Sequence, residues 1–267
     1  MKVSTRSATD GIREQDGQLV FDFSLDKQDD YLSLIADELH GDTFLGNTYH
    51  FGYQFYDNIS SQDRSKVIHF IKGLAEQKPR PSDLHKFIEK PLVLLDREIN
   101  LTTIDCIITP RSGRSPLVSQ VIQQIGDFLR HDVPPVFFEL IKSLPKSIQV
   151  DWSKFVNDVP FGASKSEDNR HRQMRDKLFD ILQKAQEKDY FSIAQLIPAK
   201  YRSYIKDYLK FEDIEKENAF KELQNKRLLI VDDINTTGAT LKEILRIIKQ
   251  VNNSCEIYIF TLIGKGD

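Results

Sequence analysis

The stretch Leu228–Leu241, LLIVDDINTTGATL, decides the fold. Its four leading apolar residues, Leu228 to Val231, are typical of a strand that is buried on both faces of a parallel sheet. Asp232 and Asp233 follow directly, so two carboxylates are expected at the carboxyl end of that strand. In an open α/β sheet this edge is where ligands bind. The stretch therefore predicts an α/β protein with a polar site at this edge.

The residues after the acidic pair predict an anion site. Thr236, Thr237 and Thr240 supply hydroxyls, and Gly238 allows the backbone to approach a ligand closely. A helix is expected next, because apolar residues recur with helical spacing over residues 241–248. Backbone N–H groups at a helix N-terminus bind phosphate well. A ribose 5-phosphate suits both parts, since its hydroxyls can donate to the carboxylates and its phosphate can accept from the loop.

Two other kinds of protein carry a similar strand, and the sequence argues against both. A P-loop nucleotide-binding protein needs a G-x-x-x-x-G-K-[ST] loop earlier in the chain, and none is present. A receiver domain needs about a hundred residues after its acidic pair to complete the sheet. Only 34 residues follow Asp233.

Further elements are predicted on both sides of this stretch. Strands are expected over residues 18–25, 48–56, 104–109, 136–140 and 256–262. Helices are expected from Ser60 or Ser61, around residues 84–88, and after residue 114 with Ser115 as N-cap and Pro116 in the first turn. Alternating strands and helices predict a parallel sheet.

The remaining segments set the expected domain organisation. Residues 1–17 are polar and are predicted to be loosely ordered. Residues 150–226 are predicted to be a mostly helical insertion, in which Tyr201, Ile205 and Leu209 share a helix face. We therefore expect an N-terminal α+β cap over residues 1–98 and an α/β core over residues 99–267 that includes the insertion.

Composition narrows the class of protein. Seventeen Phe and nine Tyr can form a substantial core. The net charge of −3 gives no basic field, so a nucleic-acid partner is not indicated. No apolar run could span a membrane and no apolar leader begins the chain, so a cytoplasmic location is expected. Cys106 and Cys255 lie in apolar runs and are predicted to be buried thiols, too few for a zinc ribbon.

The segment VDDINTTGAT, residues 231–240, resembles the signature of the type I phosphoribosyltransferases, and the resemblance covers roughly residues 100–265. It implies an open parallel sheet flanked by helices, here with the cap and the insertion added, and a site for 5-phosphoribosyl-1-pyrophosphate (PRPP). By this resemblance, Asp232 and Asp233 hold the ribose hydroxyls, with Mg²⁺ near them through waters and no direct protein ligand. The resemblance assigns the ribose 5-phosphate to Asp232, Asp233, Asn235, Thr236, Thr237, Gly238, Ala239 and Thr240.

A second loop, TPRSGRSP at residues 109–116, occupies the position of the family's pyrophosphate loop. The resemblance assigns the pyrophosphate to Arg111, Ser112, Gly113 and Arg114, and the guanidinium groups suit that anion. Asp232, Asp233 and Arg111 are then the expected catalytic residues. The competence-associated, amidophosphoribosyltransferase-like branch also has an arginine-bearing loop here, although that branch often carries a zinc ribbon that this chain lacks.

The resemblance implies a pentosyltransferase of nucleotide metabolism that transfers a phosphoribosyl group to a nitrogen acceptor and releases pyrophosphate. Thr236 stands where hypoxanthine and guanine enzymes place an acidic residue, which argues against those acceptors. Residues 165–175 are basic and suit either a loop that closes over the site or a solvated helix face, and the helix face is favoured. Two alternatives remain open: a non-catalytic module that senses PRPP or a nucleotide, and an effector subunit of a bacterial conflict (defence) system, acting as a homodimer or in a larger complex.

Overall fold

The computed structural model describes residues 8–23, 32–35, 39–56, 59–112, 115–129, 134–159, 164–188 and 192–264. The chain forms two compact units. Unit 1 consists of residues 1–138, 223–236 and 254–267, and unit 2 consists of residues 139–222 and 237–253. The division into a cap over residues 1–98 and a core over residues 99–267 stays a prediction.

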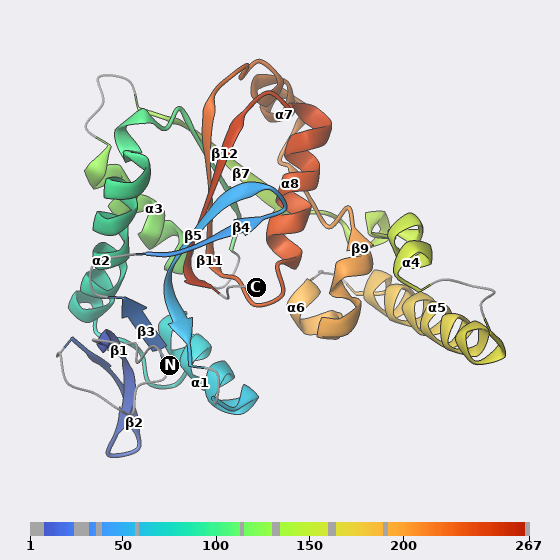
Figure 1. Cartoon of the computed structure of the whole chain (residues 1–267), viewed down its shortest axis with the longest axis horizontal. Coiled ribbons are helices and arrows are strands. Elements are labelled where there is room, and N and C mark those ends of the chain that lie inside the picture. The colour runs from blue at the N-terminus through green and yellow to red at the C-terminus, as the bar shows by residue number, and fades with distance from the viewer. Residues whose placement is uncertain are drawn as a thin grey trace, which may run out of the picture. The chain divides into compact units, whose positions relative to one another are not determined.

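Unit 1 is built on a mixed sheet with a parallel centre. Its strands are β1 (Ala8–Gln15), β2 (Gln18–Asp22), β3 (Leu32–Ile35), β4 (His40–Phe44), β5 (Asn47–Phe55), β6 (Cys106–Pro110), β11 (Arg227–Ile234) and β12 (Glu256–Gly264). Neighbouring strands follow the order β6-β11-β12-β5-β3-β1-β2, and β4 also pairs with β5 (Figure 1). The strands β6, β11, β12 and β5 are parallel, whereas β3, β4, β1 and β2 pair antiparallel. The predicted α/β class is confirmed.

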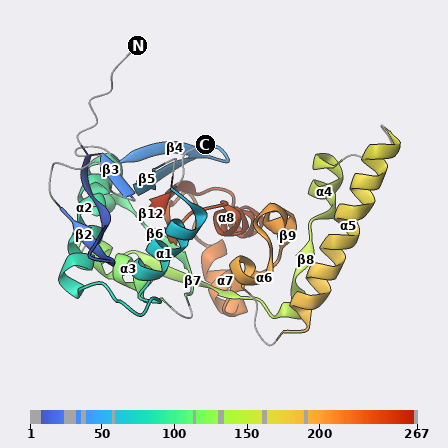
Figure 2. The same cartoon turned by 90° about the horizontal axis from the view of Figure 1, so that it is seen from below.

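Helices pack on this sheet to form the core of unit 1. They are α1 (Ser61–Ile71), α2 (Pro81–Ile99) and α3 (Leu117–Phe128), with a 3-10 turn η1 (Leu101–Thr103) after α2. Apolar side chains of the three helices join those of β5, β11 and β12 in one buried cluster. Tyr53 of β5 stacks on Phe87 of α2 at 3.8 Å and donates its hydroxyl hydrogen to the Phe87 carbonyl. Figure 2 shows α2 and α3 beside the strands of unit 1.

The starts of α1 and α3 test the predicted capping residues. Ser60 caps α1, as predicted, because its Oγ accepts from the Asp63 N–H. The predicted cap of α3 was wrong by one residue. The helix begins at Leu117 with Pro116 at the N-cap position, and Ser115 instead accepts from the Leu117 N–H through its Oγ.

A hairpin replaces part of the predicted loose N-terminus. Asp16 and Gly17 both have positive φ, 50° and 76°, which suits the two-residue turn that joins β1 to β2. The prediction of loose order was therefore wrong for residues 8–15. The hairpin register pairs Gln15 with Gln18.

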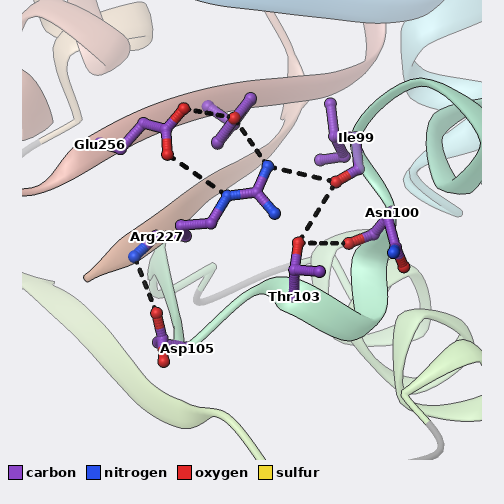
Figure 3. A network of polar contacts seen from close by, with 7 residues as sticks. Ile99, Asn100, Thr103, Asp105, Arg227 and Glu256 are labelled. Atoms are coloured by element: carbon purple, nitrogen blue, oxygen red, sulfur yellow. Dashed lines mark hydrogen bonds and ion pairs between the residues drawn. The ribbon is translucent and has the colours of Figure 1, made fainter.

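The amino ends of the central strands share one polar network, drawn in Figure 3. Arg227 at the start of β11 donates to the carbonyl of Ile99 and pairs with Glu256 at the start of β12. The Arg227 N–H donates to the Asp105 carboxylate at 2.9 Å. Although burial raises it, the pKa of Asp105 lies below its ordinary value because of this bond and the Lys226 ammonium. These contacts fix where β11 and β12 begin.

Unit 2 contains most of the insertion. Strand β7 (Val136–Lys142) enters it from unit 1, and the other elements are η2 (Pro145–Ser147), β8 (Gln149–Val150), α4 (Trp152–Asp158), α5 (Lys165–Gln186), α6 (Ile193–Leu196), η3 (Ala199–Tyr204), β9 (Ile205–Lys206), β10 (Leu209–Phe211), α7 (Ile214–Lys221) and α8 (Ala239–Val251). Strand β10 pairs antiparallel with β7, and β8 pairs with β9. Trp152 of α4 packs against Phe179 of α5.

Two predictions for the insertion have different outcomes. Residues 165–175 lie within α5, so the favoured helix face is confirmed. The helix predicted from the shared face of Tyr201, Ile205 and Leu209 was wrong. A 3-10 turn ends at Tyr204, and two short strands follow on either side of Asp207, whose positive φ of 63° no regular helix accommodates.

Two further findings concern membrane-spanning helices and the two cysteines. Among the described residues, no helix is long and apolar enough to cross a membrane. Both cysteines are free thiols. Cys106 is buried as predicted, but Cys255 is partly exposed and donates to the Leu223 carbonyl.

The contact between β5 and α2 gives a test of the unit 1 core. A Cβ added at Gly52 would lie 2.6 Å from the Pro91 Cβ and 3.0 Å from the Leu262 carbonyl oxygen. We expect Gly52→Ala to lower the free energy of unfolding by about 1–3 kcal/mol, because backbone or ring must shift. Denaturant unfolding followed by circular dichroism measures this. Gly41→Ala in β4 is the matched control, since a Cβ there meets no atom within 4 Å, and equal losses in the two variants would contradict the expectation.

Candidate functional site

Two adjacent carboxylates end the central strand β11. The strand is buried along most of its length, and only 7% of Asp232 and 5% of Asp233 is exposed. One oxygen of Asp232 accepts from the Asp233 N–H at 2.9 Å. One oxygen of Asp233 lies 2.7 Å from the ammonium of Lys72, the C-cap residue of α1. A helix outside the predicted motif therefore supplies a cation to the acidic pair.

Burial and like charge shift the pKa of Asp232. Removal from water, and to a lesser extent the neighbouring Asp233 carboxylate, raise the pKa of Asp232 to about 7. The Lys72 ammonium and the Asp233 N–H oppose this shift. A ligand that donates hydrogen bonds to Asp232, or that brings a cation, would favour its ionised form.

Asn235 links the end of β11 to two other strands. Its backbone N–H donates to the Ile263 carbonyl of β12 at 2.8 Å, and its side-chain amide donates to the Tyr49 hydroxyl of β5 at 3.0 Å. The Tyr49 oxygen also lies 2.9 Å from Oγ1 of Thr261, which is fully buried. Asn235 thus anchors the start of the loop that follows the acidic pair. These two hydrogen bonds explain why an asparagine suits this position, which the sequence alone did not explain. Its predicted contact with ribose 5-phosphate stays a prediction.

The loop after β6 begins at the same sheet edge as the acidic pair. Strands β6 and β11 are parallel, and Ile108 is level with Ile230, so both strands end close together. Arg111 and Ser112 are exposed, and the Ser112 Oγ accepts from the Ser115 N–H. The predicted residues Gly113 and Arg114 lie outside the described residues.

Beside this loop, Thr109 places a buried hydroxyl near the end of β6. Its Oγ1 has no hydrogen-bond partner among the described residues, and the residue is 5% exposed. A buried hydroxyl without a partner carries a desolvation cost of about 1–3 kcal/mol. A polar ligand group that reached this hydroxyl would remove that cost.

The second half of the predicted phosphate loop belongs to unit 2. Gly238 has φ 68° and ψ 2°, the left-handed conformation, and it is the N-cap of α8. Its carbonyl accepts from the Lys242 N–H at 2.9 Å. Thr237 is exposed, Thr240 is partly buried, and the Ala239 side chain is buried. The backbone N–H groups at the start of this 13-residue helix suit an anion.

The structure brings together the predicted residues of unit 1 that it describes. Asp232, Asp233 and the start of the loop at Arg111 share one sheet edge, and Thr236 follows as an exposed residue. Three contributors were missed by sequence reasoning: Lys72, Tyr49 and Thr261. No local pattern marks them. Lys72 contacts Asp233 and Tyr49 contacts Asn235 only once the tertiary fold has formed, and Thr261 in turn contacts Tyr49.

The donor set fits a divalent cation that is held through the ligand. In the described part of the chain, no group of three or more His, Cys, Asp or Glu side chains could hold a metal ion. Asp232 and Asp233 offer carboxylate oxygens, the ligand atoms that Mg²⁺ prefers, and Mg²⁺ usually keeps several waters. The residues therefore suit Mg²⁺ that is bound through waters and the ligand rather than in a protein cage.

The comparison with family models agrees with the motif. A family model described as the phosphoribosyl transferase domain matches residues 94–267. Among solved structures, the chain is similar to a hypoxanthine phosphoribosyltransferase from Staphylococcus aureus, with 13% identity and a TM-score of 0.33. That match covers 68% of this chain, which spans 65% of the length of the other. No curated protein matches the chain.

The raised pKa of Asp232 gives a test by pH. The folded protein binds the Asp232 proton more tightly than the unfolded chain, where the ordinary pKa is 3.8. The stabilising contribution is therefore complete below pH 3.8 and is lost as the pH rises through about 7. Asp232→Asn should remove this dependence, which is at most about 1.4 kcal/mol per pH unit for one proton.

Urea unfolding of the wild type and of Asp232→Asn at several pH values between about 4 and 8 measures this slope. Asp127→Asn, at an exposed position of α3, is the control for the substitution itself. A wild-type slope that persists unchanged in Asp232→Asn would show that other groups cause it.

Proposed function

Because the chain belongs to the phosphoribosyl transferase domain family, we propose that it binds Mg²⁺–PRPP and transfers the phosphoribosyl group to a nitrogen nucleophile, with release of pyrophosphate. The acidic pair at the end of β11 is the observation that carries this proposal. Two adjacent buried carboxylates need hydrogen-bond donors, and the 2- and 3-hydroxyls of a ribose supply them at neighbouring positions.

Each part of the ligand has a proposed partner. Asp232 and Asp233 accept hydrogen bonds from the ribose hydroxyls. The segment from Asn235 to Thr240 binds the 5-phosphate, mainly through backbone N–H groups and threonine hydroxyls. The loop from Arg111 to Arg114 binds the pyrophosphate, for which a guanidinium offers paired donors.

The proposed reaction breaks the bond between C1 of the ribose and a pyrophosphate oxygen and forms a bond from C1 to nitrogen. Positive charge develops on the sugar during such a displacement, as in glycoside cleavage. The carboxylates of Asp232 and Asp233 fix the ribose and favour that charge, while Arg111 stabilises the departing pyrophosphate. When bound, Mg²⁺ would neutralise part of the pyrophosphate charge.

The proposed acceptor is not a 6-oxopurine. Thr236 stands where enzymes for hypoxanthine and guanine place an acidic residue, and a threonine hydroxyl gives no charge to a base nitrogen. The Staphylococcus aureus protein is named for hypoxanthine, and this chain is not expected to share that acceptor. Placement in the competence-associated branch also remains a prediction.

The acidic pair gives the first test of this function. We expect the double variant Asp232→Asn, Asp233→Asn to lose at least about 100-fold in affinity for Mg²⁺–PRPP, since two charge-assisted hydrogen bonds are removed, each of about 1.5–3 kcal/mol. Titration calorimetry measures the affinity, and circular dichroism shows whether the fold is intact. Asp127→Asn is expected to bind like the wild type. A folded double variant with wild-type affinity would remove the proposed ribose role.

Arg111 gives a test of the pyrophosphate loop. We expect Arg111→Ala to weaken PRPP binding by about 10-fold or more, because one charge-assisted contact is lost. Ribose 5-phosphate, which has no pyrophosphate, should bind Arg111→Ala as it binds the wild type. Arg97→Ala, at an exposed position near the end of α2, is the matched control. Equal losses for both ligands would assign Arg111 to folding instead.

Catalysis itself is tested by release of pyrophosphate with a panel of nitrogen bases and amines. Release that depends on one acceptor supports the transferase and names its second substrate. Tight PRPP binding without release for any acceptor would instead support the non-catalytic sensing module or the effector subunit.

A further inference from the structure

Lys72 connects the N-terminal region to the proposed site. It lies at the C-terminus of α1, before the family match begins at residue 94. Its ammonium lies 2.7 Å from the Asp233 carboxylate, and its side chain is 24% exposed. Nothing in the motif or in the family match assigns this residue a role.

Charge makes a cation at this position important for a phosphorylated ligand. Asp232 and Asp233 are adjacent and buried, and the ligand itself carries several negative phosphate oxygens. Bringing two anions together in a poorly solvated place is costly, because Coulomb repulsion is weakly screened there. Among the described residues, Lys72 is a cation that already forms an ion pair with this acidic pair. It reduces the negative charge that an approaching anion meets.

The chemistry of lysine allows two contacts at once. An ammonium has three N–H donors and a flexible four-carbon stem. One donor satisfies Asp233, and the others remain for an additional acceptor. The loop at Arg111 begins at the same sheet edge, since β6 ends beside β11. A ligand group between the ribose and this loop would lie at the sheet edge where the partly exposed side chain of Lys72 already contacts Asp233.

We propose that Lys72 is a ligand-binding residue of this site: its ammonium holds Asp233 and donates to an anionic oxygen of the pyrophosphate group of PRPP. This inference rests on the proposed function. It makes the N-terminal region part of the sugar-pyrophosphate site, and it makes Lys72 a determinant of selectivity for PRPP over ribose 5-phosphate.

A different result is expected if Lys72 only forms an ion pair with Asp233 and does not contact the ligand. If Lys72 only stabilised Asp233, its loss would weaken PRPP and ribose 5-phosphate equally, because both ligands carry the same ribose hydroxyls. A direct contact with the pyrophosphate weakens PRPP alone. The ratio of the two affinities therefore separates the two roles.

The experiment compares Lys72→Met with the wild type by titration calorimetry, using PRPP and ribose 5-phosphate, each with Mg²⁺. The methionine keeps most of the apolar stem and removes the charge. We expect PRPP affinity to fall at least about 10-fold and ribose 5-phosphate affinity to fall less than about threefold, the difference corresponding to one charge-assisted contact. Lys66→Met is the matched control, because Lys66 lies on the same helix in an exposed ion pair with Glu14 and should leave both affinities unchanged.

Unfolding of the methionine variant is a separate outcome, because Asp233 would lose its counterion. Lys72→Gln then replaces it, since its amide can still donate to the Asp233 carboxylate while the charge is absent. The same selective loss of PRPP affinity is expected for Lys72→Gln.

The outcomes distinguish the two proposals. A wild-type protein that binds PRPP, with a folded Lys72 variant that binds PRPP equally well or loses both ligands equally, overturns the role of Lys72 and leaves the proposed function in place. A wild-type protein that binds no PRPP overturns both. A selective loss of PRPP affinity in the Lys72 variant, with Lys66→Met unchanged, supports the inference.

Discussion

The site depends on the burial of two adjacent carboxylates at the end of β11. Taking such a pair out of water is costly unless donors or cations surround it. Asp232 receives one backbone N–H, and Asp233 receives the ammonium of Lys72. The remaining acceptor capacity of both carboxylates is the physical basis for a ligand that brings hydroxyls. Because Lys72 belongs to α1, the pKa of Asp232 depends on a helix that lies far from it in sequence.

The two ends of the central strands have different tasks. At the amino end, Arg227 joins the starts of β11 and β12 and the end of α2, and its Nε and one Nη are engaged within the protein. At the carboxyl end, Asn235 is held by β5 and β12, while the carboxylates before it keep capacity for a ligand. Hydrogen bonds and ion pairs within the protein hold the amino ends of the strands in place, whereas the carboxylates at the carboxyl end can still accept hydrogen bonds from a ligand. The sheet can therefore act as a rigid support for the site.

The parts of the fold that could be predicted are those whose cause is local. A buried apolar run predicts β11, and helical spacing predicts α8, because both patterns are complete within a few residues. Strand β2 was predicted, but β1 was missed even though Asp16-Gly17 is a strong turn sequence, since residues 8–15 are mostly polar and do not alternate. The contacts of Lys72 and Tyr49 could not be predicted from a local sequence pattern. They exist only once β5 and α1 are placed beside β11 and β12.

Contacts that exist only in the tertiary fold also decide how much of the chain contributes to the site. The family match begins at residue 94, yet β5 lies inside the sheet, parallel to β12, and its Tyr49 holds Asn235. The segment before residue 94 therefore supports the acidic pair twice, through a hydrogen bond beneath the loop and through the charge of Lys72. A truncated chain that kept only the matched residues would lose the strands β1 to β5 of its sheet and the counterion of Asp233. The N-terminal region is consequently part of the folded site rather than an addition to it.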